Sequence, residues 1–378
     1  MKNGQTSEPS PPFLAPRAFR RSPTLALVDQ MEAARQAGQD VISLSTPSFP
    51  PSVDLPLAPL SLGLRLSAPE GDPGLRQAAR VGLFGRWELP DHDLCITAGA
   101  KAALFAILRV VDDPGARVIV SAPAWPSYDD IVRMAGHIPH AFWTRAEDGF
   151  RIDPAALSQL LTETGARAVL LANPGNPTGQ IATRAELDGA MAACVAAGAL
   201  LVLDESFSEI IADRQAWAES VTGSHPNLVV INSFSKNLHL QGQRVAACLI
   251  PSALREDFIA VHQALMSSAP SLGQAAALAA LQAGTVVDYS APRAIAVELL
   301  ARAGWPSLVN QGTFYHFPRL PDLTGTLVRL RDVGLFGLTG DIFGAPYADH
   351  LRLCFGRPEA EMAEILRRVD AAGLLGKD

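Results

Sequence analysis

A lysine flanked by hydroxyl groups and an arginine is the first feature of this sequence that could do chemistry. The segment SFSKNLHLQGQR covers residues 233–244 and places Lys236 near Ser233, Ser235 and Arg244. Most lysines lie on the protein surface, and Lys236 alone would be interpreted in that way. Its neighbours change the interpretation, because hydroxyls, a glycine and a guanidinium are the parts of a phosphate clamp beside an amine.

Two further segments offer polar groups to the same ligand. The heptad NPGNPTG at 173–179 has the composition of a turn, but its Asn176 could also place an amide in a cleft. Asp204 and Glu205 end the apolar run ALLVLD. An acid at that place is equally typical of a helix cap or a loop. A partly buried carboxylate at Asp204 could instead hold a proton on a heterocyclic nitrogen.

Short apolar runs precede all three segments and are the elements that must position them. Helical patterns such as 100–111 and 184–197 separate several of these runs, which are mostly apolar on both faces. This alternation predicts an α/β fold with a mostly parallel sheet covered by helices, which binds ligands at the carboxyl ends of its strands. We predict the strands at 94–97, 117–122, 166–173, 199–204, 228–233 and 245–250, with a further short strand at 40–45 and a helix that starts at Asp72-Pro73 and continues to Trp87.

The last part of the chain has a different character. Alanine-rich helical patterns at 274–283 and 291–303 precede the segments TFYHFPRL, LVRLRDV and HLRLCFG. A chain of 378 residues is also too long for one ordinary small core. We therefore predict a polar arm and small-domain segment at 1–50, a large domain at 51–283 and a small α+β domain at 284–378.

Composition excludes several classes of partner. The formal charge of −7 gives no general attraction for nucleic acid or an anionic membrane. Four scattered cysteines without a CxxC pair argue against a metal site or a disulfide framework. The proline-rich N-terminus has no signal-peptide core, and the apolar stretch at 190–203 is shorter than the roughly 20 residues of a membrane span. We expect a cytoplasmic protein with no metal, nucleic-acid or membrane partner.

Taken in their order along the chain, these motifs resemble the class I/II aminotransferases of the pyridoxal-phosphate (PLP) fold type I. The resemblance extends over nearly the whole chain. It implies a seven-stranded-type sheet in a large PLP-binding domain, a smaller domain built from both chain ends, and a homodimer. The other segments that carry it are EGDPGLR at 70–76, ITAGAKAAL at 96–104, PAWPSY at 123–128, GTFYHF at 312–317 and HLRLCFG at 350–356.

The resemblance also implies roles for the residues around the cofactor. Lys236 would hold PLP as a Schiff base and move a proton, while Asp204 would keep the pyridine nitrogen protonated so that the ring can accept electrons. Asn176 would bind the phenolic oxygen, and Trp125 would stack on the ring. The expected phosphate ligands are Arg244, Ser233, Ser235 and the backbone amides of Gly99, Ala100 and Lys101 at a helix start.

On the substrate side, Arg352 resembles the arginine that pairs with the α-carboxylate, a bidentate task for which lysine is a poor substitute. The alternative for Arg352 is an ordinary surface or inter-strand ion pair. Asn176 and Thr46 would also contact the substrate. The residues expected to shape the pocket are 45–49, Trp125, Tyr128 and 312–317.

Three positions depart from the family pattern. Phe207 stands beside the cofactor where a tyrosine normally donates to the phenolic oxygen, Leu66 replaces another tyrosine, and STPSFP at 45–50 replaces a glycine-containing turn. A hydrogen bond to a charged group contributes about 1.5 to 3 kcal/mol, so its loss at Phe207 would raise the pKa of the Schiff base by roughly one to two units. Either the substrate or reaction differs, or Phe207 and Leu66 are tolerated packing variants.

Three functions are compatible with these residues. The first is transfer of an amino group from an L-amino acid to a 2-oxo acid. The second keeps PLP but leads to elimination, replacement or cyclisation. The third is a non-catalytic ligand-binding protein. Relatives that regulate transcription carry a DNA-binding domain before the fold, whereas here the fold is expected to begin near residue 20, so the third function is the least favoured.

Overall fold

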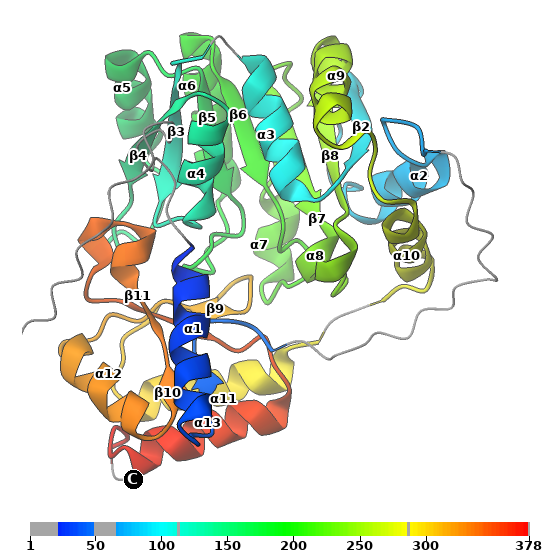
Figure 1. Ribbon diagram of the computed structural model, residues 1–378. Coiled ribbons are helices and arrows are strands. Elements are labelled where there is room, and N and C mark those ends of the chain that lie inside the picture. Colours follow the sequence, from blue (N-terminus) through cyan, green and yellow to red (C-terminus); the bar gives the residue numbers. More distant parts are fainter. Residues whose placement is uncertain (1–21, 49–65, 112–113, 286–287, 377–378) are drawn as a thin grey trace, which may run out of the picture.

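The computed structural model describes residues 22–48, 66–111, 114–285 and 288–376. These residues form two lobes, one above the other in Figure 1. Residues 66–285 make up the larger one, called here the sheet lobe, and residues 22–48 and 288–376 make up the small lobe. The proline-rich arm, Phe49 and the predicted boundary at residue 50 lie outside the described residues.

A seven-stranded sheet forms the centre of the sheet lobe. Its strand order is β2-β8-β7-β6-β5-β3-β4, and within it β8 runs antiparallel to both of its neighbours while the other pairs are parallel. The mostly parallel α/β sheet predicted from the sequence is confirmed. The strands are β2 His92–Thr97, β3 Arg117–Ala122, β4 Ile138–Trp143, β5 Ala168–Ala172, β6 Leu200–Asp204, β7 Leu228–Ser233 and β8 Ala246–Pro251.

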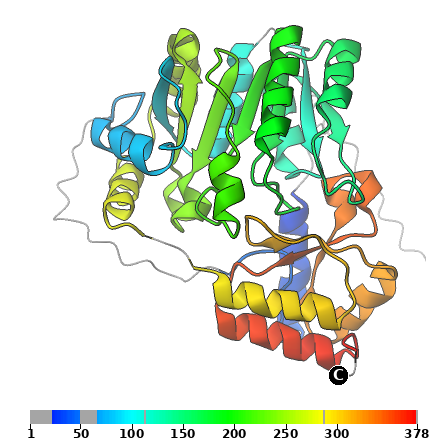
Figure 2. The same cartoon turned by 180° about the vertical axis from the view of Figure 1, so that it is seen from behind.

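These strands are apolar on both faces because helices cover both faces of the sheet (Figures 1 and 2). In β6, Leu201 and Leu203 pack with α2, α5, α6 and α10, whereas Leu200 and Val202 pack on the opposite face with α3, α4 and α9. The helices are α2 Pro73–Gly82, α3 Ala100–Val111, α4 Ser127–Met134, α5 Pro154–Thr164, α6 Arg184–Ala197, α7 Arg214–Glu219, α8 Phe234–Asn237, α9 Arg255–Met266 and α10 Ser271–Gln282.

One strand of this sheet, β4, was not predicted. It lies at the edge of the sheet and contains Pro139 and His140. An edge strand tolerates proline because one side of its backbone has no hydrogen-bonding partner strand. Most of its positions are exposed or half-buried. The continuous apolar run that marked the other strands is therefore missing here.

Capping residues set several helix ends. The Asp72 carboxylate accepts a hydrogen bond from the Leu75 amide at 2.8 Å, which confirms the predicted start of α2, but the helix ends at Gly82 instead of continuing to Trp87. Gly198 has φ 63°, the left-handed conformation that glycine adopts without penalty, and ends α6 just before β6. The apolar stretch 190–203 is thus helix, turn and strand, as expected.

The small lobe joins segments from both ends of the described chain. Leu44 packs with Leu299, Leu353 and Ile365 in one core. β1 pairs in parallel with β10, and β12 lies between β11 and β9. The expected α+β unit is therefore present. Its elements are α1 Pro23–Gln36, β1 Ile42–Ser43, α11 Ser290–Arg302, β9 Tyr315–His316, α12 Leu323–Asp332, β10 Leu335–Phe336, β11 Leu338–Thr339, β12 Leu351–Cys354 and α13 Glu359–Ala371.

No single helix in the described residues combines the length and the apolar character that a membrane span requires. The bent pair Ser252–Met266 and Ser271–Gln282 meets the criterion only when its two parts are taken together, by length and composition, and it turns through 120° at its break.

Candidate active site

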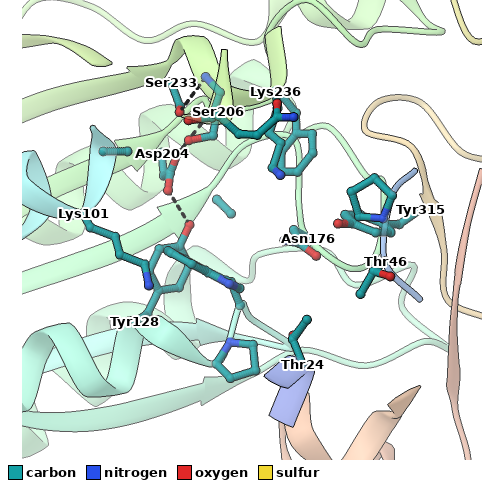
Figure 3. Close-up of a pocket in the computed structure, with 18 of the residues that line it drawn as sticks. Thr24, Thr46, Lys101, Tyr128, Asn176, Asp204, Ser206, Ser233, Lys236 and Tyr315 are labelled. Carbon is teal, nitrogen blue, oxygen red and sulfur yellow. Dashed lines mark hydrogen bonds between the residues drawn. The ribbon is translucent and has the colours of Figure 1, made fainter. Parts of the chain in front are cut away.

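A cavity of about 300 Å³ lies where the two lobes meet, and it gathers most of the predicted site residues (Figure 3). Its predicted lining residues are Thr46, Pro47, Ala100, Lys101, Trp125, Tyr128, Asn176, Asp204, Phe207, Ser233, Ser235, Lys236, Arg244, Tyr315 and Arg352. Residues that were not predicted also line it: Thr24, Pro126, Ala172, Ser206, Gln241, Ile342 and Phe343.

The sheet brings three of the predicted segments together at one edge. β5, β6 and β7 are adjacent and parallel, with Ala172 paired to Asp204 and Asp204 paired to Ile231. The carboxyl ends of parallel neighbours share an edge of the sheet, so the residues that end or follow these strands must meet there. Figure 3 shows Asp204, Ser233 and Lys236 on this side of the cavity, with Thr46 and Tyr315 across from Asp204.

The Asp204 carboxylate is held at both oxygens. Tyr128 donates its hydroxyl to Oδ2 at 2.7 Å, while the amide and hydroxyl of Ser206 donate to Oδ1 at 3.0 and 2.5 Å. Asp204 is only 5% exposed. Burial raises its pKa above the ordinary range, and the hydrogen bonds from Ser206 and Tyr128 lower it in part. A cationic partner in the cavity would therefore favour the charged form of this acid.

Tyr128 and Ser206 were missed in this role. Tyr128 was expected only to shape the pocket, and Ser206 was not singled out. The Ser206 contact has a local signal, because a serine two residues after an aspartate often donates back to its carboxylate. Tyr128 lies in the first turn of α4, on a different element from Asp204, so no sequence spacing joins the two.

Lys236 sits in α8, the short helix that follows β7 directly. Neighbouring amides fix this turn: Asn237 donates to Asn232 Oδ1 at 2.8 Å and to the Ser208 hydroxyl at 3.0 Å. Burial lowers the pKa of the Lys236 amine, and the positive charges of Arg352 and Arg244 lower it further. An amine in this environment gives up its proton more readily than a surface lysine does.

The residues predicted for a phosphate lie together between α3 and α8. Arg244 donates to the Gln241 carbonyl at 3.0 Å and lies 3.5 Å from the Ser235 hydroxyl. Gly99, with φ +89°, packs directly against the Arg244 guanidinium, and a Cβ atom there would overlap it. The Gly99 amide donates to the Thr97 carbonyl at 2.7 Å, so the N–H groups without an intrahelical acceptor begin at Ala100.

Arg352 is buried on the opposite side of the cavity, at 5% exposure. It donates to the Ser45 carbonyl at 2.7 Å and lies 3.4 Å from Asn176 Oδ1. Its guanidinium carbon is 4.4 Å from the Tyr315 ring centre and 5.0 Å from that of Phe343. Among the described residues no carboxylate lies within ion-pair distance of Arg352, which argues against the ion-pair alternative.

The described residues include two of the three departures from the family pattern and residues 45–48 of the third. Phe207 is buried against Phe314 and Tyr315, at ring distances of 5.2 and 5.9 Å, so its ring fills space between the lobes. Leu66 is 78% exposed and does not line the cavity of this chain. In the third departure, Thr46 reaches the cavity and its carbonyl accepts from Arg357 at 2.8 Å.

Glu205 points away from the cavity and has a structural partner that the sequence did not suggest. It forms a buried ion pair with Arg86, and Trp87 donates its indole N–H to Oε2 at 3.1 Å. The Arg86 guanidinium also lies 3.6 Å from the ring centre of Trp217. Burial raises the pKa of Glu205 to about 7, although the charge of Arg86 opposes this shift.

The fold and the cavity define a two-lobed α/β enzyme in which a half-buried amine and a buried carboxylate face one cavity. A model of the aminotransferase class I and II family matches residues 67–369 of this chain. The chain belongs to this family, as the motifs had indicated, and is therefore an aminotransferase, an enzyme of the transferase class.

Individual relatives agree with this assignment. An aspartate aminotransferase of Geobacillus stearothermophilus is 28% identical over 373 residues, which cover 88% of this chain and 91% of that protein. The crystal structure of the Thermotoga maritima aspartate aminotransferase has 25% identity and a TM-score of 0.80, covering 93% of this chain and 97% of the other. A mutant aspartate aminotransferase of Thermus thermophilus, at 23% identity and a TM-score of 0.81 over 95% and 98% of the chains, shows the same fold.

Proposed function

We propose that this enzyme is a PLP-dependent aminotransferase that moves an amino group from an L-amino acid to a 2-oxo acid, with Lys236 as its Schiff-base lysine. One observation carries the proposal: Lys236, Asp204 and Arg352 face a single cavity in a chain of this family. When bound, PLP supplies a conjugated ring that accepts the electrons released at the substrate α-carbon.

The residues of the cavity fit this cofactor. Arg244, the Ser235 hydroxyl and the first N–H groups of α3 would bind the phosphate, and the close packing of Gly99 on Arg244 supports such a cradle. Asp204 is a buried acid whose hydrogen-bonding partners in the described part of the chain, Tyr128 and Ser206, carry no positive charge, and it would bind the protonated ring nitrogen. Trp125 would cover one ring face and Asn176 would donate to the phenolic oxygen.

Proton transfer would depend on Lys236. Burial and two nearby guanidinium groups favour its neutral form, which can take a proton from the substrate α-carbon and return it elsewhere. Tyr128 and Ser206 would keep the Asp204 carboxylate oriented so that it can bind the protonated ring nitrogen. The ring of Phe207 carries no hydroxyl. Any hydrogen bond that lowers the pKa of the Schiff base must therefore come from other side chains.

Arg352 would bind the α-carboxylate of the substrate. Its Nη2 donates to Ser45 and its Nη1 approaches Asn176, and each of these two nitrogens keeps a second N–H for a carboxylate. Lys101 provides another cation on the cavity wall, 5.0 Å from the Trp125 ring centre. Relatives named aspartate aminotransferases act on an amino acid with a second carboxylate, and Lys101 supports a substrate of that kind here.

Assembly, compartment and domain limits complete the proposal. We propose a homodimer, supported by the exposed apolar side chains of Leu265, Met266 and Leu272. Four free, buried cysteines are compatible with a cytoplasmic location. We propose domain limits near residues 50 and 284, and the separation of the buried side chains into two cores supports this division.

Reduction of the cofactor-loaded enzyme with borohydride tests the role of Lys236. We expect peptide mapping to find the reduced cofactor on Lys236, and Lys236→Ala to lose both the label and the visible absorption band. Lys101→Ala is the matched control and should still be labelled at position 236. A label that persists in Lys236→Ala would overturn the proposal.

A panel of amino acids, each supplied with an excess of a 2-oxo acid as amino acceptor, then tests the reaction. Amino transfer predicts that, for each donor consumed, one 2-oxo acid forms from the donor and one amino acid forms from the acceptor, with aspartate among the best donors. Release of free ammonia in equal amount would instead favour the elimination reaction. Both products can be measured on the same samples, so the two outcomes are distinguishable.

A further inference from the structure

His239 follows Lys236 by one turn and has an unusual backbone. Its φ is +56°, in the left-handed region that favours glycine. Arg244, which ends the short 3₁₀ helix Gln241–Gln243, has φ +51°. Strained residues of this kind persist where the surrounding contacts over-determine them, and they gather at functional sites. A histidine at this position therefore indicates that its side chain makes a contact that glycine could not make.

That contact joins the two lobes. His239 Nε2 lies 2.8 Å from the hydroxyl of Tyr289, which is buried immediately before α11 in the small lobe. The segment that follows the Lys236 helix in the sheet lobe thus contacts the small lobe directly.

Aromatic packing continues this contact toward Arg352. The Tyr289 ring lies 5.5 Å from Phe314, and Phe314 lies 4.8 Å from Tyr315 in edge-on contacts. Tyr315 in turn packs on the Arg352 guanidinium. A short chain of contacts therefore runs from the turn that carries the amine to the guanidinium across the cavity.

The charges around the pair decide how it is protonated. Burial lowers the pKa of His239, and the neighbouring Lys236 charge lowers it further. Burial raises the pKa of Tyr289, with Cys354 and Tyr315 nearby. Arg352 and Arg244 add positive charge around Lys236. These shifts favour the neutral forms of both groups at neutral pH, and an imidazole with its proton on Nδ1 accepts at Nε2 from the Tyr289 hydroxyl.

We propose that His239 and Tyr289 are a positioning pair that holds the Lys236 turn in place against the small lobe. The inference rests on the proposed function, because it assigns the pair to the reaction of Lys236. The strained backbone at His239 is tolerated because the imidazole must reach Tyr289. Protonation of His239 turns its Nε2 from an acceptor into a donor, so the Tyr289 hydroxyl must rotate to accept, and the geometry of the pair changes as the pH falls through the lowered pKa of the histidine.

Three variants separate positioning from simple structural support. His239→Gly removes the imidazole and the strain together, so we expect a melting temperature equal to or above that of the parent but a kcat reduced by about tenfold. Tyr289→Phe removes only the hydroxyl and should lower kcat by a similar factor. The double variant should be no worse than either single variant, because both remove the same hydrogen bond.

His239→Gln is the conservative rescue, because its amide oxygen can accept from Tyr289 but does not titrate. It should restore most of kcat and remove one acid-side ionisation from the pH profile. The pH titration of the visible absorption of the bound cofactor should move in His239→Gly and Tyr289→Phe by half a unit or more. Ser267→Gly, which relieves a positive φ at the end of α9, is the control and should change none of these values.

An unchanged kcat and an unchanged spectral titration in His239→Gly and Tyr289→Phe would overturn the proposal that the two residues position Lys236. Fully additive losses in the double variant would do so as well. Labelling of Lys236 by borohydride is measured on the same variants. If labelling succeeds and the variants behave like the parent, only the proposed role of His239 and Tyr289 is rejected. If labelling fails in the parent enzyme, the proposed function itself is rejected.

Discussion

The two walls of the cavity are built in different ways. On the sheet-lobe wall, Asp204 ends β6, and the turn with Lys236 follows the adjacent β7, so each side chain is placed by its own strand. On the small-lobe wall, Arg352 depends on the Ser45 carbonyl and on the rings of Tyr315 and Phe343. Ser45 and Arg352 lie 307 positions apart in the chain.

We infer from this difference that the two walls have different roles in the reaction. The sheet-lobe wall carries the groups proposed to handle protons, and its parallel strands hold them rigidly. The small-lobe wall carries the guanidinium proposed to bind the substrate carboxylate, and its parts are joined only by tertiary contacts. Changes in the first wall should therefore act on kcat, and changes in the second should act mainly on KM or on stability.

The largest effect is expected at Asp204. Asp204→Asn keeps the size of the side chain and an oxygen for Tyr128 or Ser206, but it removes the negative charge. Since buried charge complementarity is among the strongest catalytic effects, kcat for the best amino acid should fall on the order of 10³-fold. Steady-state kinetics with excess cofactor measure the change.

KM for the amino acid should stay within a few-fold in this variant, and the melting temperature of the apo-protein serves as the folding control. A kcat within tenfold of the parent value would mean that the sheet-lobe wall does not carry the chemistry. The proposed contrast between the walls would then be lost.

A smaller effect, on stability, is expected in the small lobe. His316 is 3% exposed, and burial together with the charge of Arg293 lowers its pKa from 6.5 to about 4. The folded-state pKa is below the unfolded value, so the stability from neutral His316 is complete above pH 6.5 and is lost as the pH falls toward 4. The loss between pH 7 and pH 4.5 amounts to about 2–3 kcal/mol.

His316→Gln should remove most of that loss. Urea unfolding at pH 7 and at pH 4.5 gives the two free energies of unfolding, and their difference is compared between parent and variant. His140→Gln, an exposed position on β4, is the matched control and should keep the parent difference. Equal acid sensitivity in the parent and His316→Gln would show that the small lobe is not the acid-labile part.

The smallest effect is expected at Arg352. Arg352→Lys keeps the charge but loses the bidentate geometry, so about 2 kcal/mol of carboxylate binding should be lost. We expect kcat/KM to fall roughly 30-fold, chiefly through a higher KM. Arg319→Lys changes an exposed ion pair with Asp349 and is the control. A fall in kcat with an unchanged KM would contradict the assignment of the two walls.

Several parts of the site could be predicted because local signals identify them. The runs before Asn176, Asp204 and Lys236 are apolar on both faces, which is typical of buried parallel strands, and adjacent parallel strands end at one edge. The edge strand β4 lacked that signal because of Pro139 and its partial exposure. Tyr128 and Phe343 were missed as partners of Asp204 and Arg352 because each contact joins separate elements.

The amino-acid sequence by itself determined the family, the apolar strands that carry the site, and the residues that could supply an amine, an acid and a guanidinium, because these depend on local periodicity and motif order. The tertiary structure decided which groups act on one another: the hydrogen bonds that orient Asp204, the aromatic rings around Arg352 and the link from His239 to Tyr289. Those contacts depend on packing between distant segments, and packing is a property of the whole folded chain.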